Sequence, residues 1–121
     1  MSWKIFEAFP NYEVSHKGQI RSLKTGKLIK GALNEAGYRR TCLYRNGESK
    51  SFYVHRIVAF LFIPNPNNYD EVHHINGNRD DNRSCNLMWV THEQNMQFIY
   101  KPHKPNYKFK NTQPVLKLEY A

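Results

Sequence analysis

The sequence predicts an α+β fold, in which a small N-terminal antiparallel β-sheet plus helix precedes a compact strand-loop-strand-helix (ββα) unit and a basic C-terminal arm. Three observations predict this fold. Turn residues alternate with short apolar or aromatic runs as far as Tyr53. Apolar residues then recur at helical spacing from Val54. Finally, a helix-start signal at Thr91 follows two short apolar runs.

The first half of the chain is expected to form the antiparallel sheet. Strands are predicted near Gln19–Ser22, Tyr38–Arg45 and Ser51–Val54, with shorter extended pieces before and between them. Asn46-Gly47 is the strongest hairpin signal, because a two-residue primed turn needs positive φ at both positions. The second and third predicted strands should therefore pair with each other.

A helix of about nine residues is expected to follow, since Val54, Ile57, Val58 and Leu61 recur at helical spacing. It should end at the segment Ile63-Pro64-Asn65-Pro66. Proline lacks the N–H donor and biases the preceding residue toward extended geometry.

The ββα unit comes next. Glu71–Ile75 and Leu87–Val90 should be short strands, and Asn76–Ser84 a polar loop between them. Thr91, with a Gln three positions later, matches a capping box, so a helix should run from there to about residue 100.

The chain thus divides into three predicted parts, which are residues 1–53 as an N-terminal β module, 54–100 as the helix plus ββα core, and 101–121 as a basic extended arm. A last apolar piece, PVLKLEY, would be an edge strand or the beginning of another module.

The net charge of +8 indicates a polyanionic partner such as nucleic acid, or otherwise a solvated basic surface. Residues 1–60 carry a net charge of +7, residues 61–100 of −3 and residues 101–121 of +4. This pattern fits basic arms that hold phosphates around a centre that holds a cation. The longest apolar run, Ile57–Ile63, is far shorter than a bilayer span. The start lacks a signal peptide, and Cys42 and Cys85 form no CxxC pair, so we expect a cytoplasmic protein without a disulfide framework.

Residues 72–95, VHHINGNRDDNRSCNLMWVTHEQN, hold the groups that phosphodiester hydrolysis needs. That reaction needs a base to deprotonate water and a cation to take up charge on the phosphate oxygens. His73 and His74 lie at the end of a predicted strand, and Asn95 lies in the first turns of the following helix, from which its amide would point back toward them if the helix packs over the strands. Adjacent residues of a strand face opposite sides, which suits one histidine on a metal and the other on water.

This segment resembles the HNH nuclease motif in its His-Asn-Asn form, as found in homing endonucleases of phages and introns. The N-terminal stretch WKIFEAFPNYEVSHKGQIRSLKTGK resembles the nuclease-associated modular domain of type four, which commonly precedes that motif. The resemblance covers about residues 3–97. It implies a ββα-metal (HNH) nuclease core and a metal-dependent DNA endonuclease that acts on double-stranded DNA.

Carried over by position, the resemblance implies that His74 is the general base and that His73 and Asn95 bind one divalent cation. Asn86 would orient the base through the backbone near His74. His73 stands where this class often has Asp, and imidazole suits Mn²⁺ or another transition metal better than Mg²⁺. Mg²⁺ remains the first expectation because it is the most available ion.

Basic residues on strands and turns are the predicted DNA contacts, because a small sheet can enter a groove and neutralise phosphates. They are Arg21, Lys24, Lys27, Lys30, Arg39, Arg40, Arg45 and Arg56. Relatives often add a helix-turn-helix, which this sequence does not include, so specificity would be relaxed or supplied by the sheet and the basic arm. Asn82 is expected to be a turn-former.

Two alternatives stand beside the nuclease hypothesis. One is a non-catalytic DNA-binding module with a degenerate HNH fold. The other is a structural zinc module that uses His73, His74 and His92, whose metal removal would unfold the protein. For a nuclease, one active site per chain predicts that a monomer nicks a single strand.

Overall fold

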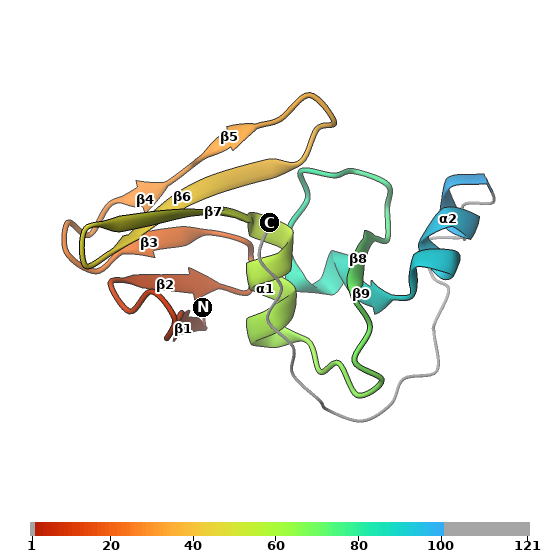
Figure 1. Cartoon of the computed structure of the whole chain (residues 1–121), viewed down its shortest axis with the longest axis horizontal. Coiled ribbons are helices and arrows are strands. Elements are labelled where there is room, and N and C mark those ends of the chain that lie inside the picture. Colours follow the sequence, from red (N-terminus) through yellow and green to blue (C-terminus); the bar gives the residue numbers. More distant parts are fainter. Residues whose placement is uncertain (1, 101–121) are drawn as a thin grey trace.

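The structure is a computed structural model that describes residues 2–100, so the predicted basic arm at residues 101–121 lies outside the described residues. Figure 1 shows the arrangement of the elements. In chain order they are β1 (Trp3–Ile5), β2 (Tyr12–Ser15), β3 (Ile20–Ser22), β4 (Leu28–Ile29), β5 (Ala32–Leu33), β6 (Arg39–Arg45), β7 (Glu48–Tyr53), α1 (Val54–Phe62), β8 (Glu71–His74), the 3₁₀ turn η1 (Ser84–Asn86), β9 (Leu87–Val90) and α2 (His92–Tyr100). Among the described residues, no helix is both long and apolar enough to cross a bilayer.

The predicted antiparallel strands are confirmed, but they are divided between two N-terminal sheets rather than joined in one. The strand orders are β1-β2-β3-β4 and β5-β6-β7. The chain passes from the first sheet to the second through Gly31, which has a φ of 61°. A Cβ atom at this position would lie 2.1 Å from the backbone oxygen of Arg40. Only glycine permits this close turn, so Gly31 separates β4 from β5.

The β6-β7 hairpin confirms the Asn46-Gly47 prediction. Both turn residues have positive φ, at 50° for Asn46 and 79° for Gly47. The register pairs Arg45 with Glu48 directly across the turn. A two-residue primed turn of this kind matches the right-handed twist of its strands.

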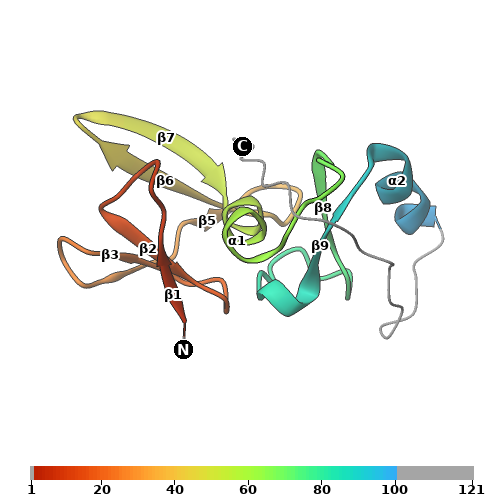
Figure 2. The ribbon, with the colours of Figure 1, turned by 90° about the horizontal axis from the view of Figure 1, so that it is seen from below.

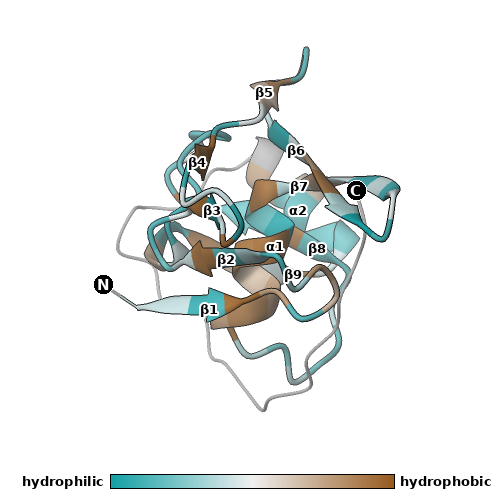
Figure 3. Ribbon diagram, turned by 90° about the vertical axis from the view of Figure 1, so that its left-hand side faces the viewer, coloured by the Kyte–Doolittle hydropathy of each residue, from teal (hydrophilic) through white to brown (hydrophobic). Residues whose placement is uncertain are grey.

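Helix α1 lies between the N-terminal sheets and the ββα unit (Figure 2). It spans nine residues and ends before Pro64, as its sequence predicts. It contacts β2, β6 and β7 on the sheet side, and β8, β9 and η1 on the other. Ile57 and Val58 are fully buried in one core that both halves share. In Figure 3, apolar ribbon segments gather around α1 and β2. One shared core implies that the two halves fold as a unit.

The ββα unit has the predicted order of strand, loop, strand and helix. Strands β8 and β9 are antiparallel, with His74 opposite Leu87. At the start of α2 the capping box is complete, because Thr91 Oγ1 accepts from the Gln94 N–H and Gln94 Oε1 accepts from the Thr91 N–H, each at 3.0 Å. Trp89 Nε1 donates to the backbone oxygen of Ile63 at 3.1 Å, which ties β9 to the end of α1.

Candidate active site

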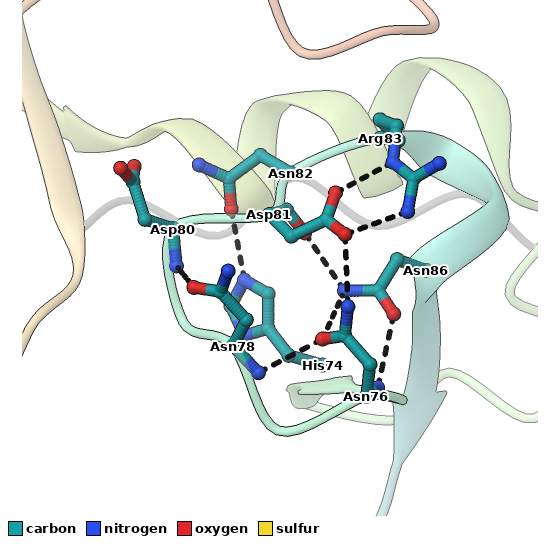
Figure 4. A network of polar contacts seen from close by, with 8 residues as sticks. All are labelled: His74, Asn76, Asn78, Asp80, Asp81, Asn82, Arg83 and Asn86. Carbon is teal, nitrogen blue, oxygen red and sulfur yellow. Dashed lines mark hydrogen bonds and ion pairs between the residues drawn. The ribbon is translucent and has the colours of Figure 1, made fainter. Parts of the chain in front are cut away.

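Side chains of the β8-β9 loop hydrogen-bond to the loop's own backbone (Figure 4). Asn76 Oδ1 accepts from the Asn78 N–H at 2.8 Å, and Asn78 Oδ1 accepts from the Asp80 N–H at 3.0 Å. Such bonds are the reason that Asn and Asp favour turns. Arg83 pairs with Asp81 at 2.7 Å, and this hydrogen bond is the main reason that the pKa of Asp81 falls to about 2. These local bonds give the loop a defined shape.

Asn86 hydrogen-bonds to the part of the loop that directly follows His74. Its Nδ2 donates to Asn76 Oδ1 at 3.0 Å and to the Asp81 backbone oxygen at 2.9 Å. Its Oδ1 accepts from the Asn76 N–H at 3.0 Å, and its backbone oxygen accepts from the Ile75 N–H at 2.8 Å. Asn86 is buried, so these bonds satisfy a polar group that water cannot reach. Asn86 is the residue that the resemblance gives as orienting the base, and its contacts are with the backbone next to His74.

The side chain of His74 is held by Asn82. His74 is only 4% exposed and Asn82 only 6%, and His74 Nε2 lies 2.8 Å from Asn82 Oδ1. An amide oxygen can only accept, so Nε2 carries the ring proton and Nδ1 keeps its lone pair. A turn-forming role therefore does not describe Asn82 fully. No spacing in the sequence indicated this contact, because it crosses the loop through space.

Aromatic rings surround the other side of the His74 imidazole. The ring centroid of His55 lies 4.9 Å away and that of Tyr38 lies 5.9 Å away. Burial lowers the pKa of His74, and the hydrogen bond to Asn82 offsets part of this effect. Burial, followed by the nearby His74 and Arg56, lowers the pKa of His55 to about 3. Both imidazoles are therefore neutral near pH 7, and a neutral His74 can accept a proton.

His73, next to His74 at the end of β8, packs toward α2. It stacks on Phe98 with a centroid distance of 4.3 Å and an interplanar angle of 20°. On the same side, Asn95 Nδ2 donates to Glu71 Oε1 at 2.8 Å, and Glu71 Oε2 pairs with His92 Nδ1 at 2.6 Å. Because Glu71 holds the amide nitrogen of Asn95, the amide oxygen faces away from this carboxylate.

A cleft of about 260 Å³ brings the predicted site residues together. It is lined by Tyr38, Val72, His73, His74, Gly77, Arg79, Asn95 and Phe98. A second cleft, of about 250 Å³, shares Tyr38, Val72 and Asn95 with the first and adds Arg56. The predicted base and both predicted metal ligands thus line one cleft, to which Arg79 also contributes, and Arg56 lines the second cleft.

The donor atoms at this cleft fit a catalytic metal better than a structural one. Within the described part of the chain, no three His, Cys, Asp or Glu side chains come together as a metal site. His73 and the Asn95 amide oxygen would leave the remaining coordination positions to water and phosphate, as a catalytic ion requires. The alternative zinc site is not formed among the described residues, where His74 is bonded to Asn82 and His92 to Glu71, and the three histidines do not come together.

Three of the arginines predicted to contact DNA have partners within the protein. Arg21 pairs with Glu13 and lies 4.0 Å from the centroid of the Trp3 ring. Arg39 forms a two-point ion pair with Asp80, and this hydrogen bonding raises the pKa of Arg39. Arg45, the third, donates to the Ala8 backbone oxygen at 2.8 Å and lies over the Phe9 ring.

Four of the other predicted DNA contacts are exposed, and Arg56 is half-buried. Lys24, Lys27 and Lys30 are exposed around the β3-β4 turn, and Arg40 is exposed on β6. Arg56 lies at the second cleft, 5.8 Å from the centroid of a Trp89 ring. Arg40 also lies 5.3 Å from the centroid of the Tyr53 ring, so internal contacts extend to all five of the predicted arginines, while the three lysines are exposed.

Comparison with known families agrees with this geometry. A family model described as HNH endonuclease matches residues 52–97, and one described as NUMOD4 motif matches residues 1–44. Residues 52–97 are thus an HNH endonuclease domain, and a NUMOD4 motif precedes it.

Relatives of the HNH domain are known from viruses. The DNA endonuclease I-HmuI of Bacillus phage SP01 is 40% identical over 101 residues, which cover 80% of this chain and 56% of the phage protein. The uncharacterized HNH endonuclease L245 of Acanthamoeba polyphaga mimivirus is 43% identical over 93 residues, which cover 77% of this chain and 28% of that protein. The chain therefore spans between about a quarter and just over half of these relatives.

A solved structure of the HNH homing endonuclease I-HmuI, described as showing DNA binding and cleavage by that enzyme, has the same fold. The match has a TM-score of 0.73 at 37% sequence identity, and it covers 86% of this chain and 62% of that one. The α+β fold predicted from the sequence is confirmed by this match.

Proposed function

We propose that this chain is a metal-dependent DNA endonuclease of the HNH homing type, which hydrolyses phosphodiester bonds with His74 as general base. The observation that carries the proposal is the buried, neutral His74, fixed on Asn82 and lining the same cleft as His73 and Asn95. The HNH domain and the DNA-cleaving relative support it.

In the proposed reaction, His74 takes a proton from water. With Nε2 bonded to Asn82, the lone pair on Nδ1 accepts this proton. The water oxygen attacks phosphorus, and the bond from phosphorus to the 3′ oxygen breaks. The leaving oxygen then takes a proton from solvent, which yields 5′-phosphate and 3′-hydroxyl ends. Asn82 and Asn86 keep the base and its loop in place through this step.

His73 and Asn95 are the proposed metal ligands. A divalent cation held there would supply positive charge to a phosphate oxygen and to the leaving 3′ oxygen. Glu71 holds the Asn95 amide, and Phe98 packs against the His73 ring, so both side chains are oriented by neighbours. Mg²⁺ is the proposed ion on availability, with Mn²⁺ as the alternative that an imidazole ligand favours.

Double-stranded DNA is the proposed substrate, held by the exposed Lys24, Lys27, Lys30 and Arg40 and by Arg56 at the second cleft. One active site per chain supports nicking by a monomer in the host cytoplasm, where DNA is accessible. A double-strand break would then need two copies acting on opposite strands.

Supercoiled plasmid is the substrate that tests this proposal. Purified protein and His74→Ala are each incubated with EDTA, Mg²⁺ or Mn²⁺, and the open-circular and linear products are separated on a gel. We expect metal-dependent open-circular DNA from the unmodified protein and none from His74→Ala. Glu48→Ala is the control, since Glu48 is exposed in the β6-β7 hairpin and does not line the cleft, and it should still nick.

A gel-shift assay in EDTA separates catalysis from binding. His74→Ala should bind DNA as the unmodified protein does, because the buried imidazole contributes no charge near pH 7. If no metal supports cleavage by the unmodified protein while salt-sensitive binding is present, the chain is a DNA-binding module and the nuclease proposal is rejected.

A further inference from the structure

The β8-β9 loop contacts the NUMOD4 portion of the chain at two places. Its first contact is with the turn between β2 and β3. Gly18 in that turn packs against the main chain of Asn82 so closely that a Cβ atom on Gly18 would lie 2.8 Å from the Asn82 oxygen. Next to this contact, the Ser84 N–H donates to the His16 backbone oxygen at 2.7 Å.

A second set of contacts holds the middle of the loop, at residues 79 and 80. Arg39 on β6 donates from Nε and Nη2 to the two carboxylate oxygens of Asp80, at 2.7 and 3.1 Å. Arg39 Nη1 also donates to the Lys30 backbone oxygen at 2.9 Å, which fixes the guanidinium on its own sheet. Beside it, Arg79 Nη1 donates to the Ala36 backbone oxygen at 2.8 Å.

Asn82 lies between Asp80 and Ser84, which both contact the NUMOD4 portion, and it packs on Gly18 itself, while its side chain holds His74. Residues 79 and 80 are attached to β6 and the turn before it, and residues 82 and 84 to the β2-β3 turn. A segment held on both sides of Asn82 by another part of the chain transmits a displacement of that part to Asn82. The distance from Asn82 Oδ1 to His74 Nε2 therefore depends on the N-terminal sheets.

We propose that the NUMOD4 portion, besides any contact with DNA, positions the general base, with Gly18 and Arg39 as positioning residues that act through Asn82. This inference rests on the proposed nuclease function. It assigns Arg39 to the active-site loop rather than to a phosphate. It also predicts that the HNH domain needs its N-terminal partner for catalysis and not only for binding.

Gly18 gives the sharper test. Its φ of 86° favours glycine, and the group that a Cβ would strike is main chain, which cannot rotate away as a side chain can. Gly18→Ala must therefore displace Asn82. Gly47→Ala is the matched control, because Gly47 has a similar φ of 79° but nothing lies within 4 Å of its Cβ position. Both variants share the backbone strain, and only Gly18→Ala moves the loop.

The assay measures the single-turnover nicking rate at saturating protein, and separately the Kd for DNA in EDTA. We expect Gly18→Ala to lower the rate about 10- to 100-fold, as a misplaced catalytic group does. Its Kd should stay within about threefold of the unmodified value, and Gly47→Ala should keep the rate. Equal rates for the two glycine variants would overturn the inference.

Arg39 provides an independent test through charge reversal. Arg39→Asp places two carboxylates together and should lower the nicking rate, and the double variant Arg39→Asp with Asp80→Arg should recover most of it. A phosphate contact would behave differently, since Arg39→Asp would then raise Kd at an unchanged rate and the exchange would restore nothing. That second pattern would refute a positioning role for Arg39.

An NMR readout keeps this inference distinguishable from the nuclease proposal. With ¹⁵N-labelled histidine, the hydrogen-bonded Nε2–H of His74 should give a signal that Gly18→Ala shifts or broadens and Gly47→Ala preserves. If the unmodified protein cleaves no DNA but this difference is seen, the nuclease proposal fails and the positioning contact stands. If the protein cleaves DNA and the signal is the same in both variants, the positioning contact fails alone.

Discussion

Replacing Asn82 by Leu would remove the only hydrogen-bond acceptor that the described residues place on His74 Nε2, while keeping a side chain of similar size. His74 is 4% exposed, so its Nε2–H would lose its partner in a site that water reaches poorly. A buried donor without an acceptor costs about 1–3 kcal/mol. The free energy of unfolding should therefore fall by about 1–3 kcal/mol, provided that the ring keeps its proton on Nε2.

The ring has one way to avoid that cost, which is to move its proton to Nδ1. Nδ1 would then no longer accept a proton from water, and the lost orientation should slow nicking by about 100-fold or more. The stability effect and the rate effect thus arise from two responses to one change. At least one of them must appear if Asn82 holds the base.

Three measurements test Asn82→Leu. Urea unfolding at pH 7.5 reports the free energy, single-turnover nicking of plasmid reports the rate, and ¹⁵N shifts of the imidazole report the tautomer. Asn67→Leu is a control for an exposed Asn outside the HNH domain's cleft. A variant with unchanged stability, unchanged rate and the proton still on Nε2 would refute the argument that Asn82 orients His74.

Three further predictions follow from other parts of the structure. The pKa of His55 is lowered from an ordinary 6.5 to about 3 in the folded protein. As the pH falls below about 6.5, the unfolded chain therefore binds a proton that the folded chain does not, and folding stability is lost. Between pH 7 and pH 5 the free energy of unfolding should fall by about 2 kcal/mol, which urea unfolding at the two pH values measures. An equal loss in His55→Phe would show that His55 is not its source. EDTA should abolish nicking but leave the melting temperature within about 2 °C of the value without EDTA, because the hydrophobic core forms without metal. Unfolding by EDTA would instead indicate a structural ion. Lys24→Ala and Lys27→Ala should each lower the slope of log Kd against log salt by about one, measured by fluorescence anisotropy, and an unchanged slope would exclude that lysine from the phosphates.

Several elements could be predicted because their signals are local. The Asn46-Gly47 hairpin, helix α1 and the Thr91 capping box each depend on residues within a few positions of one another. The location of the HNH domain could also be predicted from the sequence, because its histidines and asparagines lie in one continuous segment. The division of the N-terminal strands into two sheets could not be predicted from the sequence, since it depends on how closely Gly31 approaches Arg40.

The sequence also could not show which basic residues have partners within the protein. Charge alone marks Arg39 and Lys27 equally as candidates for DNA contact. In the folded chain Arg39 meets Asp80, which is 41 positions away, while Lys27 remains exposed. A count of charges predicts a polyanionic partner, but it cannot say which cations are already neutralised within the protein.

The sequence by itself determined the order of the elements and the residue types available for phosphodiester chemistry, because periodicity, turn chemistry and motif spacing are properties of neighbouring residues. Only the tertiary structure decided that Asn82 holds His74, that His55 lies beside it, and that Gly18 and Arg39 fasten the loop between them. The Asn82–His74 bond crosses a single loop, whereas the contacts of His55, Gly18 and Arg39 join segments that meet only when α1 brings the sheets and the ββα unit onto one core.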